Sequence, residues 1–147
     1  MISDYILKDS IQLIDSVSSW EEAIRISTEP LLKGGYIKEN YVDAMINGVK
    51  EFGPYIIIAP MIAMPHARPE CGALKMGISI LKLKEPVSFT DDGENQAKIL
   101  FALSAVESES HIHILSDICT LLSDEEVYQK IINCEDYEEL LSLLKVK

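Results

Sequence analysis

The stretch NYVDAMINGVKEFGPYIIIAP (residues 40–60) changes from a helical to a strand pattern within one short run of sequence. Its first part repeats large apolar side chains at helical spacing: Tyr41, Met45, Val49 and Phe52. The helix is expected to end at Gly53–Pro54. The segment YIIIAP (55–60) that follows is short, β-branched and wholly apolar, which is typical of a strand covered on both faces. A helix that leads into such a strand indicates an α/β fold.

Segments on both sides extend this alternation. SSWEEAIRISTEPLLKGG (18–35) predicts a helix that starts at a Ser19–Glu22 capping box and ends at Gly34–Gly35. Pro30 is expected to kink or divide this helix. Two strands and one further edge strand are predicted: MGISILKLK (76–84), KILFALSAV (98–106) and SIQLID (10–15). Three helical stretches close the chain: SHIHILSDICTLL (110–122), SDEEVYQKIINC (123–134) and EDYEELLSLLK (135–145). This order predicts an α/β sandwich with a mixed parallel/antiparallel sheet.

Length and charge limit the kind of protein. The 147 residues are expected to form a single domain, 1–147. The net charge of −11, without any run of Lys or Arg, argues against a nucleic acid partner. No apolar run reaches the roughly 18 residues of a membrane span, and MISDYILKDS (1–10) lacks the order of a signal peptide. The prediction is a cytoplasmic protein.

Cysteine usage gives no sign of a metal or disulfide framework. Cys71, Cys119 and Cys134 are an odd number and contain no CxxC pair. Cys119 and Cys134 lie in apolar helical patterns and are expected to be small core residues. No metal and no cofactor are expected.

Two of the three histidines lie on one predicted helix. The residues that share the face of His111 are apolar: Leu115, Ile118 and Leu122. His113 instead lines up with Asp117 and Thr120, and is expected to be exposed and inert. Positions two apart on a helix are rotated by about 200°, so these two histidines cannot bind one metal ion together.

His111 falls in the first turn of that helix, with Ser108 or Ser110 as the expected N-cap. A helix N-terminus keeps a nearby histidine neutral and attracts anions, which suits a phosphate oxygen. The alternative is a buried histidine that is hydrogen-bonded to a carbonyl.

The segment MPHARPE (64–70) places His66 just beyond the predicted strand, where α/β folds usually carry their chemistry. Pro65 stiffens the backbone there. A carbonyl that held one ring nitrogen would fix the tautomer and aim the other nitrogen outward as a nucleophile. Arg68 has a fork of donors that suits a phosphoryl group. An ion pair between Arg68 and Glu70 is the alternative.

The segment APMIAMPHARPE (59–70) resembles the active-site segment of EIIA components of the bacterial phosphoenolpyruvate-dependent sugar phosphotransferase system, in the fructose–mannitol type of fold. The resemblance spans roughly Ser19 to Leu144. It includes FGPYIIIAP (52–60), KMGISILKLKEPVSF (75–89) and ALSAVESESHIHIL (102–115). The PHxRPE form, with GPY ahead of it, is most similar to the ascorbate-type branch. The resemblance implies a mixed sheet flanked by helices on both faces.

The resemblance also implies roles for residues and partners. His66 matches the phosphorylated histidine of the family, and His111 matches its second active-site histidine. His66 would accept a phosphoryl group from phospho-HPr through Nε2 and pass it to a cysteine of an EIIB component, which serves a membrane-embedded EIIC transporter. EIIB and EIIC select the sugar, for which the subtype suggests ascorbate or a pentitol. The sequence leaves a homodimer open.

One departure concerns the cation that stabilises the phosphoryl group. Mannitol-type members place an arginine near the end of the helix before the strand, whereas this chain has Lys50 there. Lys50 shares a face with Asp43 and Asn47 and is expected to be solvated. Arg68 is the other candidate.

Two rival functions use the same residues. A regulatory module of this fold would accept phosphate from HPr and signal to a protein partner instead of serving transport. A hydrolase would pair Cys71 with His66, but no orienting acid or oxyanion motif accompanies them. The chain has no GxxxxGK[ST] loop, so ATP is not the expected donor.

Overall fold

A computed structural model describes residues 2–145, so the two expected domain ends, 1 and 147, lie outside the described part. Five strands form one sheet in the order β1-β4-β5-β3-β2. Their bounds are β1 (Ile6–Ile14), β2 (Ile57–Ala59), β3 (Met61–Ala63), β4 (Gly77–Ser88) and β5 (Gln96–Ser104). β1 pairs with β4 and β3 with β5 in parallel, whereas β4–β5 and β2–β3 are antiparallel. The predicted mixed sheet is confirmed.

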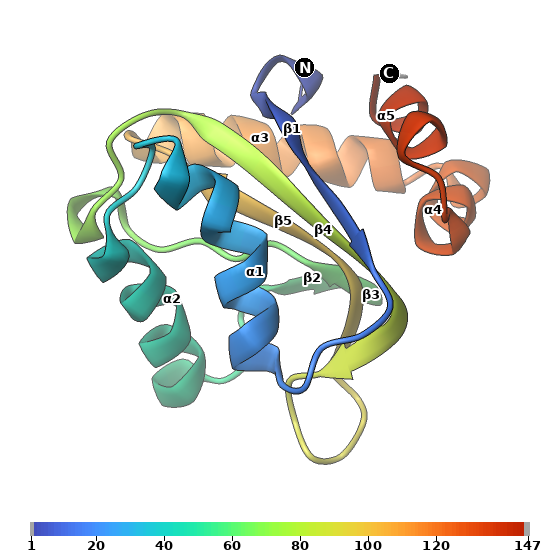
Figure 1. The fold of residues 1–147 in the computed structure, drawn as a ribbon, viewed down its shortest axis with the longest axis horizontal. Coiled ribbons are helices and arrows are strands. Elements are labelled where there is room, and N and C mark those ends of the chain that lie inside the picture. Colours follow the sequence, from blue (N-terminus) through green and yellow to red (C-terminus); the bar gives the residue numbers. More distant parts are fainter. Residues whose placement is uncertain (1, 146–147) are drawn as a thin grey trace.

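Helices cover both faces of this sheet (Figure 1). α1 (Trp20–Lys33) and α2 (Glu39–Phe52) lie on one face. The opposite face is covered by α3 (Ser108–Leu122), α4 (Glu125–Asn133) and α5 (Tyr137–Lys145). Two short 3-10 helices complete the chain, η1 (Ile2–Asp4) and η2 (Pro69–Cys71). Among the described residues, no helix is both long enough and apolar enough to cross a membrane.

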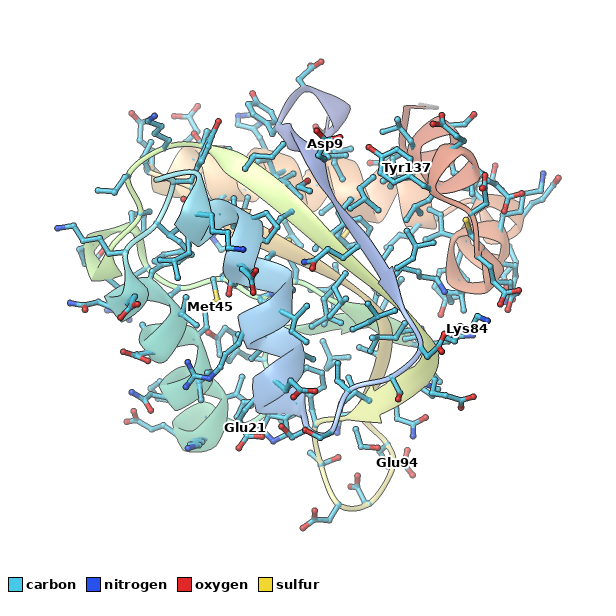
Figure 2. The ribbon with its side chains drawn as sticks, viewed as in Figure 1. Asp9, Glu21, Met45, Lys84, Glu94 and Tyr137 are labelled. Atoms are coloured by element: carbon cyan, nitrogen blue, oxygen red, sulfur yellow. The ribbon has the colours of Figure 1, made fainter. Side chains whose placement is uncertain are left out.

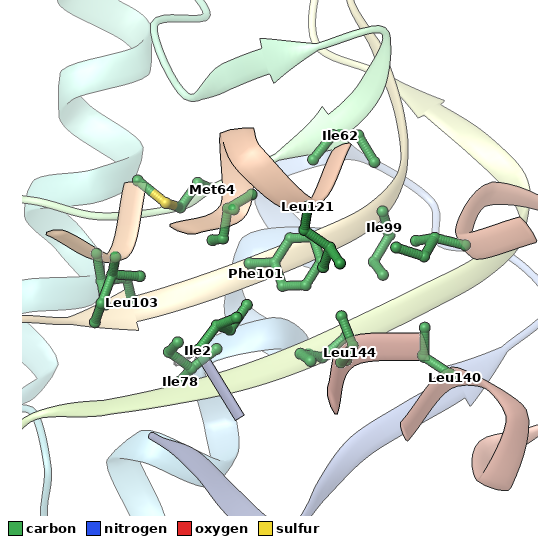
Figure 3. Close-up of a cluster of buried hydrophobic side chains, with 14 of the residues drawn as sticks. Ile2, Ile62, Met64, Ile78, Ile99, Phe101, Leu103, Leu121, Leu140 and Leu144 are labelled. Atoms are coloured by element: carbon green, nitrogen blue, oxygen red, sulfur yellow. The ribbon is translucent and has the colours of Figure 1, made fainter. Parts of the chain in front are cut away.

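Two apolar cores separate the layers because successive side chains of a strand point to opposite faces. Along β5, Ile99, Phe101 and Leu103 face α3 to α5 (Figure 3), while Leu100 and Ala102 face α1 and α2. All five side chains are buried. Figure 2 shows the contrast between interior and surface, with Met45 inside against the sheet and Glu94 on the exposed β4–β5 loop.

The predicted capping box of α1 is confirmed in one of its two bonds: Ser19 Oγ accepts a hydrogen bond from the N–H of Glu22 at 3.2 Å. The Glu22 carboxylate accepts from the N–H of Ser18 at 2.9 Å instead of from that of Ser19. Of the two predicted effects of Pro30, a kink or a division, the division is wrong, because α1 continues through Pro30 to Lys33. Pro30 has no N–H for the carbonyl of Ile26, four residues earlier. That carbonyl instead accepts from Gln12 Nε2 of β1 at 2.7 Å. A partner from the neighbouring strand therefore replaces the missing helical bond.

The segment predicted as one fully covered strand, 55–60, contains only β2, and a second short strand, β3, follows it. β2 is half-buried and lies at the end of the strand order, and β3 lies inside the sheet next to β5. The chain reverses between them at Pro60, and Met61 takes a left-handed φ of 68°. The strand that leads to His66 is therefore β3, which lies after the predicted segment and was not predicted.

Of the two predictions that a cysteine is a core residue, one is confirmed and one is wrong. Cys134 is buried, as predicted, whereas Cys119 is exposed and its prediction as a core residue is wrong. The buried face of α3 consists of Ile114, Ile118 and Leu121. Cys119 follows Ile118 and is rotated out of that face.

Candidate functional site

The backbone that carries His66 is held on both sides. After β3 ends, the N–H of Met64 donates to the carbonyl of Ile56 at 2.8 Å. The N–H of Leu103 in β5 then donates to the carbonyl of Pro65 at 2.9 Å. The chain thus stays bonded to its neighbours up to the residue before His66, although the regular strand has already ended.

The ring of His66 is fixed by its own segment. Its Nδ1 lies 2.6 Å from the carbonyl oxygen of Met64, so Nδ1 carries the proton and donates it. The lone pair is then on Nε2. This is the carbonyl contact that the sequence led us to expect, and it leaves Nε2 as the nucleophilic atom.

A second imidazole lies beside the first. The ring centroids of His66 and His111 are 4.4 Å apart, with the planes tilted by 56°. His111 is in the first turn of α3, and its Nε2 is buried without a hydrogen-bond partner. The alternative of a carbonyl-bonded histidine therefore does not apply to this nitrogen, which is free for a ligand.

The expected serine N-cap of α3 is wrong. Glu107 occupies the N-cap position without a capping bond from its side chain, and the helix already begins at Ser108. Ser110 is inside the helix and the N–H of His111 donates to the carbonyl of Glu107 at 3.2 Å. His111 still lies in the first turn, so its relation to the positive helix end is as expected.

His66 and His111 lie in a pocket of about 520 Å³ between α2 and the His66 segment. Other lining residues are Ala44, Gly48, Phe52, Tyr55, Ala67, Arg68, Pro69 and Cys71. Arg68 is exposed at this pocket, and no ion pair joins it to Glu70 in the described chain. Lys50 is exposed, as predicted, and is not among the lining residues.

Two aromatic residues of the pocket were not identified as functional from the sequence. Phe52 continues the apolar helical spacing of Tyr41, Met45 and Val49, but it is at the end of α2 and is 75% exposed. Tyr55 donates its hydroxyl to the carbonyl of His66 at 2.8 Å, and its ring meets the imidazole edge-on at 5.4 Å. Gly48 leaves room for this ring, because a Cβ there would lie 3.0 Å from the Tyr55 hydroxyl. Tyr55 belongs to the GPY motif, which was the available signal.

The third histidine lies apart from this pair. The side chain of His113 is 74% exposed and its Nε2 is 3.7 Å from a carboxylate oxygen of Glu109. The prediction of an exposed His113 is confirmed. Within residues 2–145, no group of three or more His, Cys, Asp or Glu side chains is placed to hold a metal ion.

Both pocket histidines are expected to titrate below pH 6.5. Burial lowers the pKa of His66, the Met64 carbonyl partly opposes this, and the nearby His111 lowers it further. Burial also lowers the pKa of His111. At these two histidines the unfolded chain therefore binds more protons than the folded chain between the lowered folded-state pKa and about pH 6.5, so their contribution to stability should fall as pH drops through this window. NMR titration of the imidazole resonances gives the pKa values, and a midpoint for His66 at or above 6.5 would contradict the burial described here.

Comparison with known proteins adds to this geometry. The sequence model of the family described as "Phosphoenolpyruvate-dependent sugar phosphotransferase system, EIIA 2" matches residues 4–147. The mannitol-specific cryptic phosphotransferase enzyme IIA component of Escherichia coli (strain K12) is 41% identical over 143 residues, which is 97% of each chain. The ascorbate-specific PTS system EIIA component of the same strain is 36% identical over 136 residues, 92% of this chain and 88% of that protein.

A solved complex shows the same fold. The structure of enzyme IIAMTL with phosphorylated enzyme IIBMTL from Escherichia coli matches with a TM-score of 0.82 and 30% identity, covering 94% of this chain and 96% of that chain. The chain described here is thus similar to proteins named for two different substrates.

Proposed function

This chain belongs to the EIIA 2 family of the phosphoenolpyruvate-dependent sugar phosphotransferase system, and from that membership we propose that it carries a phosphoryl group on His66. The observation that carries the proposal is the contact of His66 Nδ1 with the Met64 carbonyl at 2.6 Å. It leaves Nε2 as the nucleophilic atom of a residue that lines the pocket. Family members are phosphotransferases, and a fixed, neutral imidazole is the group such a transfer needs.

The proposed transfer of the phosphoryl group needs only the donor protein and this chain. The lone pair of His66 Nε2 forms a bond to phosphorus while the P–N bond of the donor phosphohistidine breaks and its electron pair returns to the donor ring. The proton on His66 Nδ1 stays with the ring and keeps its bond to the Met64 carbonyl. The phosphorylated ring is an imidazolium, and this carbonyl dipole stabilises its charge.

Two side chains are proposed to hold the phosphoryl oxygens. His111 Nε2 is buried without a partner and can donate from a ring whose centroid is 4.4 Å from that of His66. Arg68 lines the same pocket and forms no ion pair in the described chain, so its guanidinium is available for the oxygens. Lys50 is not among the lining residues. We therefore assign the cationic role to Arg68.

The partners follow from the family. We propose phospho-HPr as the donor and a cysteine of an EIIB component as the acceptor, with a membrane EIIC served indirectly from the cytoplasm. The similarity to an enzyme IIA in complex with phosphorylated enzyme IIB supports the acceptor. The relatives named here are specific for mannitol and for ascorbate, with 41% and 36% identity, so these two are the sugars to test first.

The test is incubation with phosphoenolpyruvate, enzyme I and HPr, followed by intact-mass measurement. The protein should gain one phosphoryl group and lose it again when unphosphorylated EIIB is added. Loss to EIIB supports the transport role. Retention of the group in the presence of the mannitol-type and ascorbate-type EIIB proteins would favour the regulatory module instead. No gain in mass would contradict the proposal.

Replacement of Cys71 tests the rival hydrolase. Cys71 is half-buried and lines the pocket, but the proposed transfer gives its thiol no role. Cys71→Ser should therefore accept phosphate from HPr at a rate within about threefold of the parent rate. A rate about 100-fold lower, equivalent to about 2.7 kcal/mol of transition-state stabilisation, would instead support the hypothesis of a hydrolase that uses Cys71 and His66.

A further inference from the structure

The hydroxyl of Tyr41 joins two backbone segments that are distant in sequence. Tyr41 lies in the first turn of α2 and its side chain is fully buried. Its hydroxyl lies 3.1 Å from the carbonyl oxygen of Ala67 and 3.0 Å from that of Leu103. The N–H of Ala67 donates to the same hydroxyl at 3.3 Å. One side-chain oxygen thus meets three backbone groups.

These two segments carry the two histidines of the pocket. Ala67 directly follows His66. Leu103 is near the end of β5, from which the chain enters α3 and reaches His111. Since the N–H of Leu103 also donates to the carbonyl of Pro65, both backbone groups of Leu103 help to hold the segment around His66. The relative placement of the two imidazoles therefore depends on this junction.

A hydroxyl suits the junction because it both donates and accepts. It accepts from the N–H of Ala67 and shares its single proton between two carbonyls. Burial raises the pKa of Tyr41 to about 12, so the group stays protonated at neutral pH and remains a donor. Phenylalanine would fill the same space but would leave three backbone groups without this partner.

We infer that Tyr41 is a positioning residue for phosphoryl transfer, which holds the His66 segment at a fixed separation from the strand that leads to His111. This inference rests on the function proposed above. Tyr41 does not line the pocket that contains the two histidines, so it acts through the backbone of Ala67 and Leu103. Misplacement of reacting groups by about 1 Å can cost roughly 100-fold in rate, and the loss of one junction should cost less.

The test is a single-turnover measurement with phospho-HPr on Tyr41→Phe. We expect a rate constant about 10-fold lower, with nearly all of the protein still phosphorylated at the end. Tyr128→Phe is the matched control, since its hydroxyl donates to the carbonyl of Pro60 in the β2–β3 turn and Tyr128 does not line the pocket. Its rate should stay within about twofold of the parent rate. A purely structural defect would instead lower the final extent of phosphorylation and leave the rate constant unchanged, and that result would overturn the inference.

Hydrogen exchange provides a readout that does not require the variant to fold. The amide of Ala67 is in an irregular segment, and the Tyr41 hydroxyl is the partner that the structure gives it. In the parent protein it should exchange at least about 10-fold more slowly than an unprotected amide. Exchange at the unprotected rate would overturn the inference, as would an unslowed transfer rate in Tyr41→Phe. A parent protein that gains no phosphoryl group would overturn the proposed function as well, so the two failures are distinguishable.

Discussion

His66→Ala should gain no phosphoryl group from phospho-HPr, while the parent protein gains one. The reason is that the variant removes Nε2, the nucleophilic atom left when Nδ1 is held by the Met64 carbonyl. Intact-mass measurement after incubation with phosphoenolpyruvate, enzyme I and HPr detects the difference. The adduct on the parent should be lost in acid and survive base, as expected for a phosphoramidate.

His113→Ala is the matched control, because this histidine is 74% exposed and lies outside the pocket lining. It should be phosphorylated to the same extent as the parent. Peptide mapping completes the test. A modified peptide that contains His113 or Ser110 in place of His66 would show that the wrong residue has been assigned.

The second large effect is expected for His111. His111→Ala should slow phosphoryl transfer to EIIB by roughly 10- to 150-fold, because a charge-assisted hydrogen bond made in the transition state is worth about 1.5–3 kcal/mol. The basis is the buried, unpartnered Nε2 in a ring whose centroid is 4.4 Å from that of His66. Rapid-quench kinetics with phosphorylated protein and EIIB measures the effect.

Folding and hydrogen bonding can be separated at this position. Thermal unfolding should show that His111→Ala still folds, since the residue lies at the edge of the buried face of α3. His111→Gln should recover part of the lost rate, because its amide can donate a hydrogen bond but does not titrate. A folded His111→Ala protein that transfers at the parent rate would exclude the proposed role of this histidine.

Local patterns in the sequence predicted much of the fold. The capping box of α1 depends on two residues three positions apart, and the long strands β4 and β5 contain segments rich in apolar residues, so both could be recognised. β3 was missed because it has only three residues and follows a proline. The continuity of α1 through Pro30 was missed because the compensating donor, Gln12, belongs to another element.

Local patterns also identified some residues of the candidate site and missed others. His66 could be found because it lies in a distinctive short motif, and His111 because helical periodicity and the resemblance agreed on it. From the sequence, Tyr41 was interpreted only as an apolar residue of the helix. Its role could not be found because its hydroxyl contacts a carbonyl 62 residues away in the chain. No local pattern records a contact over that separation.

The direction of β5 also determines where the molecule can be handled in the laboratory. The strand begins at Gln96 beside the exposed β4–β5 loop and ends at Ser104, one residue past the bond between Leu103 and Pro65. Nine residues of strand span about 30 Å. Gly93 in that loop has a left-handed φ of 74° and open space around the position of a Cβ. A linker that tethers the protein to a sensor chip or carries a dye is best inserted beside this glycine, where the length of β5 separates the attachment from the segment that carries His66.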